Sequence, residues 1–225
     1  MKFKEFISST INKFKEAEFF LAKTIENYHN PNEFQYNLNA FIQAFRNITF
    51  MLQSEKNKPT NFDMWYSGKQ EEMRNHNILR KLVNARNIVV KQSSLSHRSK
   101  VQVGLFRGRK MKLAYIHEID PMTDTKEILE MGKKHFIGFM LDEGHSAIEE
   151  QVGVKRTWVV EELGEEEIVS ICFTAIKYMR GLICEALELF GVKVVYDDVN
   201  LNMSKIQVLL ETDLDPSLRK KWDWD

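Results

Sequence analysis

Acidic residues are missing from one long stretch of this 225-residue chain. The 45 residues from Met73 to His117 contain no Asp or Glu, although they contain eleven Lys and Arg. The whole chain is neutral, with 32 basic and 32 acidic side chains. Positive charge is therefore segregated, and segregated charge attracts phosphates or acidic partners. This composition predicts a class of partner and leaves the reaction open.

Proline, glycine and cysteine are also scarce, with 4, 10 and 2 residues. Few Pro and Gly favour long helices over many turns. No apolar run approaches the roughly 20 residues that span a bilayer, and residues 1–5 do not open a secretory signal. We expect a cytoplasmic protein without membrane association. Cys172 and Cys184 lie on one expected helix, roughly 18 Å apart, which is too far for a disulfide.

The two halves of the chain carry opposite net charge. Residues 1–100 contain 16 basic and 9 acidic side chains, whereas residues 101–225 contain 16 basic and 23 acidic ones. The halves can neutralise each other, or the basic half can bind an external polyanion such as RNA. Both interpretations stay open here.

Four amphipathic helices are expected in residues 1–97. Apolar spacing predicts them over residues 8–28, 32–54, 62–74 and 77–92. The second has an unbroken heptad seam of Phe34, Leu38, Phe41, Phe45, Ile48 and Leu52. Long helices joined by short loops pack as antiparallel neighbours. We therefore predict an N-terminal antiparallel helical bundle.

The pattern changes after residue 97. Alternating apolar residues predict a β-hairpin over residues 101–116, with Gly108 in its turn. Further elements are expected in order: a helix over 124–140, a strand over 154–160, a long amphipathic helix over 165–190, and strands over 192–196 and 206–210. The long helix is expected to pack on the bundle. Residues 98–225 thus form a predicted α+β extension of a mainly α protein.

Three charged residues, Glu18, Arg46 and Arg86, fall within the apolar seams of the expected helices. Such residues are rarely fully buried unless they are paired. They are either structural ion pairs or rim positions, or else arginines held half-buried so that the guanidinium can bind a phosphate. In the second case Glu18 would orient Arg46 or Arg86.

The basic stretch contains further candidates. The hairpin tip is expected to add phosphate-binding groups, namely Arg107, Arg109 and Lys110. Three other cations are interpreted as ordinary solvated helix charges, namely Arg74, Arg80 and Lys81. The tail, residues 220–225, carries Trp222 and Trp224 between charges. It is expected to dock on its own domain or on a protein partner.

The fourth expected helix reads Leu82-Val83-Asn84-Ala85-Arg86-Asn87-Ile88-Val89-Val90-Lys91. Together with the long antiparallel helices, it resembles the HEPN-like superfamily over roughly residues 8–92. The resemblance implies an all-α bundle, often dimeric, and in many members a metal-independent ribonuclease of toxin–antitoxin or phage-defence systems. The signature is Arg, usually a polar residue, four to six intervening residues, then His. Arg86 and Asn87 match its opening, but position 91 is Lys91.

The missing histidine limits the implied chemistry. In that family histidine handles protons while arginine stabilises charge on the phosphate, and lysine ordinarily stays protonated at neutral pH. We therefore expect a degenerate site, with Arg86, Asn87 and Lys91 in the catalytic positions, that binds RNA or another phosphate-rich polyanion. A homodimer without metal or cofactor is expected. A metal-independent ribonuclease and a non-catalytic structural or partner-binding protein stay open as alternatives.

Overall fold

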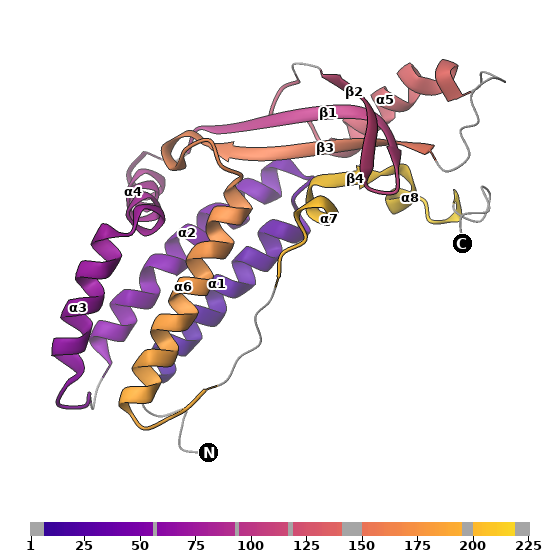
Figure 1. Ribbon diagram of the computed structural model, residues 1–225. Coiled ribbons are helices and arrows are strands. Elements are labelled where there is room, and N and C mark those ends of the chain that lie inside the picture. Colours follow the sequence, from indigo (N-terminus) through magenta and orange to yellow (C-terminus); the bar gives the residue numbers. More distant parts are fainter. Residues whose placement is uncertain are drawn as a thin grey trace. The chain divides into compact units, whose positions relative to one another are not determined.

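The structure, a computed structural model, describes residues 7–55, 58–92, 95–116, 119–140, 150–194 and 200–218. It is mainly helical, with a small four-stranded antiparallel sheet (Figure 1). The chain folds into two compact units. The helical unit contains residues 1–26, 35–96 and 159–201, and the sheet unit contains residues 27–34, 97–158 and 202–225. We expected a domain boundary between residues 97 and 98. The chain passes from the helical unit to the sheet unit one residue earlier, between residues 96 and 97.

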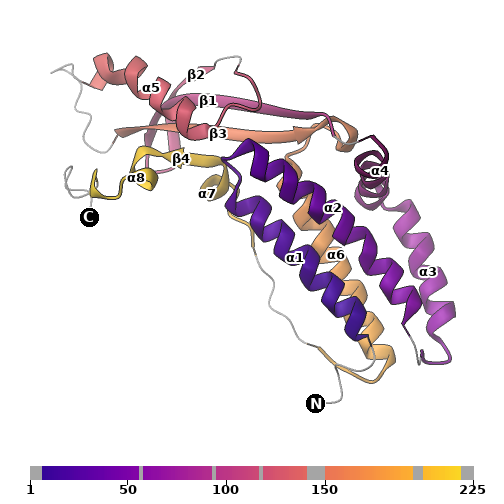
Figure 2. The same cartoon turned by 180° about the vertical axis from the view of Figure 1, so that it is seen from behind.

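Five long helices build the helical unit. They are α1 (Ser8–Glu26), α2 (Pro31–Ser54), α3 (Phe62–Asn75), α4 (Asn77–Gln92) and α6 (Ile168–Leu189). In both ribbon views α1, α2 and α6 run side by side (Figures 1 and 2). These bounds lie close to those expected from apolar spacing, and α1 packs against α6. The long helix, which we assigned to the C-terminal extension and expected to pack on the bundle, is thus part of the helical unit.

Local sequence sets the ends of α6. The Glu167 carboxylate caps its first turn by accepting a hydrogen bond from the Ser170 amide at 2.8 Å. Its end is followed by Gly191 at φ 73°, a left-handed conformation that glycine adopts readily. Between these ends the helix buries a broad apolar face, including Cys172, which is free, as is Cys184. Both cysteines agree with the expectation that no disulfide joins them.

No helix among the described residues is both long enough and apolar enough to cross a membrane.

The strands of the sheet unit lie in the order β2-β1-β3-β4. Its strands are β1 (His97–Arg107), β2 (Lys110–Ile116), β3 (Glu150–Val160) and β4 (Val208–Leu210). The expected hairpin is confirmed, since β1 and β2 pair antiparallel around Gly108, whose φ is 53°. The strand expected over 154–160 is also confirmed, and it begins earlier, at Glu150.

The last two expected strands were largely wrong. Residues 192–194 do not form a strand, and residues 195–196 lie outside the described part of the chain. Residues 206–207 belong to a short helix, α7 (Met203–Gln207), so β4 keeps only three residues. The cause is local, because the Asn202 side chain accepts a hydrogen bond from the Lys205 amide and caps that helix. A final short helix, α8 (Glu211–Leu214), follows β4.

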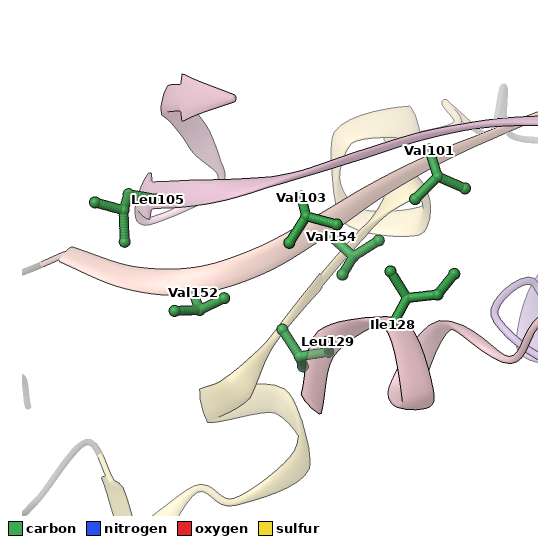
Figure 3. Close-up of a cluster of buried hydrophobic side chains, with 7 residues drawn as sticks. All are labelled: Val101, Val103, Leu105, Ile128, Leu129, Val152 and Val154. Carbon is green, nitrogen blue, oxygen red and sulfur yellow. The ribbon is translucent and has the colours of Figure 1, made fainter. Parts of the chain in front are cut away.

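Apolar side chains that alternate along β1 and β3 pack the sheet against helix α5 (Thr125–Met140). Val101, Val103 and Leu105 of β1 form a cluster with Val152 and Val154 of β3. Ile128 and Leu129 of α5 point into this cluster (Figure 3). Successive residues of a strand face opposite sides of a sheet. On the opposite face, Phe106 of β1 packs with Val208 and Leu210 of β4. The sheet therefore buries apolar residues on both faces.

Trp158 fixes the turn between α1 and α2 to β3. Its indole nitrogen donates to the Tyr28 carbonyl oxygen at 2.8 Å, and its ring stacks on Phe34 with centroids 4.7 Å apart. The Tyr28 hydroxyl donates to the Arg156 carbonyl oxygen at 3.2 Å. These contacts explain why residues 27–34 belong to the sheet unit.

The buried Arg156 and the half-buried His29 lie in the same region. Arg156 is fully buried, donates from Nη2 to the Thr123 carbonyl oxygen at 2.6 Å, and lies over the Trp158 ring. Burial and then the positive charge of Arg156 lower the pKa of His29 to about 4. His29 is therefore neutral in the folded protein at neutral pH.

Gly132 of α5 is expected to tolerate no side chain. A Cβ there would lie 2.4 Å from Cγ1 of Val103, because the helix approaches the sheet closely. We predict that Gly132→Ala destabilises the protein by about 1–2 kcal/mol in urea unfolding, since overpacking outweighs the gain in helix propensity. Gly68→Ala in α3, where nothing lies within 4 Å, is the matched control and should be neutral or stabilising. Equal effects of the two changes would contradict the close approach.

The pKa of His29 predicts how stability depends on pH. Its folded value, about 4, lies below the ordinary 6.5, so the unfolded chain binds a proton in this window that the folded protein does not. Stability should therefore fall by about 3 kcal/mol as pH drops from 6.5 to 4, and should be flat above 6.5 for this group. Urea unfolding across this range should show a shallower slope in His29→Gln, because carboxylates titrate alike in both proteins. Identical slopes would refute the assignment.

Candidate functional site

Four helices of the helical unit enclose a pocket of about 360 Å³. Three of these helices contribute four residues each, mostly three or four positions apart, which lie on one face of a helix. The lining residues from α2 are Phe45, Arg46, Thr49 and Gln53, and those from α3 are Tyr66, Gln70, Met73 and Arg74. From α4 come Leu79, Arg80, Val83 and Asn84, and from α6 comes Met179. Apolar side chains and arginines therefore share one concave surface.

Arg46 is held in place on the α2 side of the pocket. Its Nη1 donates to the Thr49 hydroxyl, and its guanidinium carbon lies 4.0 Å from the centroid of the Phe50 ring. Partial burial and the positive charge of Arg86 lower the pKa of Arg46. A guanidinium fixed by a hydroxyl and a ring face keeps other N–H groups available for a ligand.

Polar contacts also hold the pocket wall between α2 and α3. The Gln53 amide donates to the Tyr66 hydroxyl at 3.0 Å, and that hydroxyl donates to the Thr49 carbonyl oxygen at 3.3 Å. Burial raises the pKa of the Tyr66 phenol, so the phenol stays neutral at physiological pH. The wall is therefore preorganised before any ligand arrives.

The lining carries positive charge without an acid. None of its residues is Asp or Glu, and it contains three arginines, Arg46, Arg74 and Arg80. Only Arg74 has a carboxylate nearby, since its Nη1 lies 3.2 Å from Glu71. Among the described residues, no carboxylate oxygen lies within 4 Å of Arg46 or Arg80. Such a pocket can hold an anion at its arginines and an apolar group on its walls.

The residues assigned to catalytic positions lie nearby on α4. Arg86 is half-buried and contacts the Asn87 side-chain oxygen at 3.4 Å, whereas Lys91 is exposed. None of the three lines the pocket, although the charge of Arg86 acts on Arg46. Arg46 itself, predicted as a phosphate-binding residue, does line the pocket.

Glu18 does not orient Arg46 or Arg86, so this expectation was wrong. Its carboxylate lies 2.6 Å from Nη2 of Arg180 on α6. The stripe of α1 that carries Glu18 packs against α6, and an arginine of the partner helix is therefore closer. The alternative of a structural ion pair is the one the structure shows for Glu18.

The cations of the hairpin tip are largely engaged by the protein's own acids. Nη2 of Arg109 lies 2.7 Å from Asp213, and its Nη1 donates to the Val208 carbonyl oxygen. Nη2 of Arg107 lies 3.6 Å from Glu150. Lys110 is exposed. Arg109 therefore ties the hairpin to β4 and α8, which is a structural role that the expected phosphate-binding surface did not include.

Two pocket arginines were missed by the sequence reasoning. Arg74 and Arg80 were interpreted as solvated helix charges, as was Lys81, which donates to the Leu163 carbonyl oxygen at 2.9 Å. A usable signal was present, because Arg80 has no acid three or four positions away on its helix. Its lack of an intrahelical partner distinguishes it from Arg74, which follows Glu71 by three residues.

Comparison with known proteins gives the family. The family model for bacteriophage lambda protein ea47 matches residues 8–212, so the chain belongs to the ea47 family. Protein ea47 of Escherichia phage lambda is 29% identical over 161 residues, which are 70% of this chain. The chain spans only 38% of the length of that relative. No solved structure matches.

This family membership corrects several expectations. The chain matches the ea47 family, and nothing in the comparisons indicates the HEPN-like superfamily. The predicted RNA or polyanion binding and the ribonuclease alternative are withdrawn with it, as is the toxin–antitoxin or phage-defence setting. The catalytic roles of Arg86, Asn87 and Lys91 came from that resemblance and lose their basis.

The pairing of Glu18 can be tested by a double-mutant cycle. We predict a coupling energy of about 0.5–1 kcal/mol between Glu18→Gln and Arg180→Met in urea unfolding, because the ion pair is short but partly solvated. The cycle of Glu18→Gln with Arg46→Met is the control and should give no coupling. Coupling to Arg46 instead of Arg180 would restore the original expectation.

Proposed function

We propose that the helical unit of this ea47-family protein binds a small anion that also carries an apolar group. The observation that carries this proposal is the pocket lining, whose described residues combine arginines with apolar side chains and include no Asp or Glu. The proposed ligand fits both parts of that surface.

Electrostatics supports the anionic part of the ligand. A guanidinium stays charged at physiological pH, and several in one pocket without a carboxylate create a positive potential. The fixed position of Arg46 lowers the entropy lost on binding, because Thr49 and Phe50 already restrain it.

Apolar lining supports the remainder of the ligand. Phe45, Leu79 and Met179 are buried residues that border the pocket, and Val83 is half-buried. The volume of about 360 Å³ lies at the lower end of the range for small-molecule sites. An inorganic anion would leave this apolar surface unused.

Two expectations about partners stay predictions. A homodimer is one, and a protein partner for residues 220–225 is the other. The tail lies outside the described residues, so this proposal does not draw on it.

The fluorescent probe 8-anilino-1-naphthalenesulfonate tests the proposed function, since it joins a sulfonate to aromatic rings. We predict one binding site per chain in the native protein at pH 7. Arg46→Met and Arg80→Met should each weaken binding about tenfold, because each removes a charge-assisted hydrogen bond. Fluorescence titration gives the affinities, and circular dichroism checks that each variant is folded.

Matched controls make this test specific. Lys91→Met removes the same charge from an exposed position of α4 outside the pocket and should leave binding unchanged. Val83→Phe fills the pocket but keeps its arginines, and it should weaken binding. N-phenyl-1-naphthylamine lacks the sulfonate and should bind more weakly. Equal loss in Lys91→Met, or no loss in the two arginine variants and Val83→Phe, would overturn the proposal.

A further inference from the structure

The pocket arginines differ in how far their charge is compensated. Arg74 has Glu71 at 3.2 Å, and both side chains are largely exposed. Arg46 and Arg80 have no carboxylate oxygen within 4 Å among the described residues, and both line the same pocket. Among the described residues, no carboxylate therefore compensates these two guanidinium charges.

These two arginines come from different helices, and their side chains differ in how strongly the protein restrains them. Arg46 on α2 is restrained by the Thr49 hydroxyl and the Phe50 ring. Arg80 on α4 is exposed, and it makes no side-chain hydrogen bond or ion pair among the described residues. The first can thus serve as a fixed binding group, and the second can close on a ligand that has already bound.

Arg46 and Arg80 both line the pocket, and the positive charge of Arg86 repels that of Arg46. Two separate monoanions would relieve this repulsion, but each would need space in a small pocket. A single head group with two negative charges relieves it with one ligand, and it lets both guanidinium forks donate hydrogen bonds.

Resting on the proposed function, we propose that the ligand is a small phosphate monoester, whose doubly charged head group bridges Arg46 and Arg80. Its apolar body lies against Phe45, Leu79 and Val83. A phosphate monoester carries close to two negative charges at neutral pH, since its second pKa is about 6. Its three terminal oxygens can accept from both arginines and from the Gln70 or Asn84 side chains that line the pocket.

A matched pair of probes tests this inference by isothermal titration calorimetry. 1-Naphthyl phosphate and 1-naphthalenesulfonate share the same rings and differ in head-group charge. We expect the phosphate to bind at least tenfold more tightly at pH 8. This preference should shrink to nearly none at pH 5, where the phosphate monoester carries one charge.

The sulfonate also reports any titration of the protein between pH 5 and 8. The described lining contains no Asp, Glu, His or Cys. Glu71, Glu72 and His76 are close in sequence to the lining residues of α3 and α4, and Tyr178 and Glu185 lie on α6 near Met179. Any change of protein charge in this pH range acts on both probes, so the ratio of the two affinities isolates the ligand's charge.

Variants separate this inference from the proposed function. Arg80→Met should abolish the preference for the phosphate while a weaker sulfonate binding at Arg46 remains, and Lys91→Met should leave the preference intact. Equal affinity for both probes at pH 8 would overturn the phosphate monoester and leave the proposed function standing. Binding of neither probe would overturn both. Inorganic phosphate should bind more weakly than naphthyl phosphate, and equal binding would remove the apolar part of the inference.

Discussion

A guanidinium keeps its charge when it leaves water, so each arginine needs a partner, and the partners differ from site to site. Arg180 has the Glu18 carboxylate, and Arg109 has Asp213. Arg156 is fully buried and uses a backbone carbonyl and the face of Trp158. Among the described residues, the partners of Arg46 are a hydroxyl and a ring. The first three arginines hold the fold together, and the fourth is left able to bind.

Much of the fold could be predicted from the sequence, because apolar residues recur with a clear period. The heptad seam of α2 and the alternation around Gly108 gave both elements near their observed bounds. The assignment of residues 27–34 to the sheet unit could not be predicted in this way. It depends on Trp158 meeting Tyr28 across 130 residues of sequence, and periodicity carries no information about such contacts.

The candidate site was predictable only in part. Arg46 stood out because it lies beside Phe45 of an apolar seam, and it does line the pocket. Arg80, Gln70 and Asn84 sit on polar faces that look solvated in sequence. Whether such residues face one another depends on how α2, α3 and α4 are rotated and crossed, which side-chain packing decides. The catalytic assignment rested on a short motif on one helix that was matched without its histidine, and it lost its basis with the HEPN-like resemblance.

The two parts of the acid-free stretch, residues 73–117, have different surroundings in the structure. Its hairpin cations meet acids from later in the chain, as Arg109 meets Asp213. Its first part, residues 73–92, instead supplies six of the lining residues of the pocket. On α4 the positions three or four residues from Arg80 are Asn77, Val83 and Asn84, and an acid there would be placed to pair with it. An internal ion pair would neutralise Arg80, so the absence of acids at these positions preserves the positive charge on which the proposed function depends.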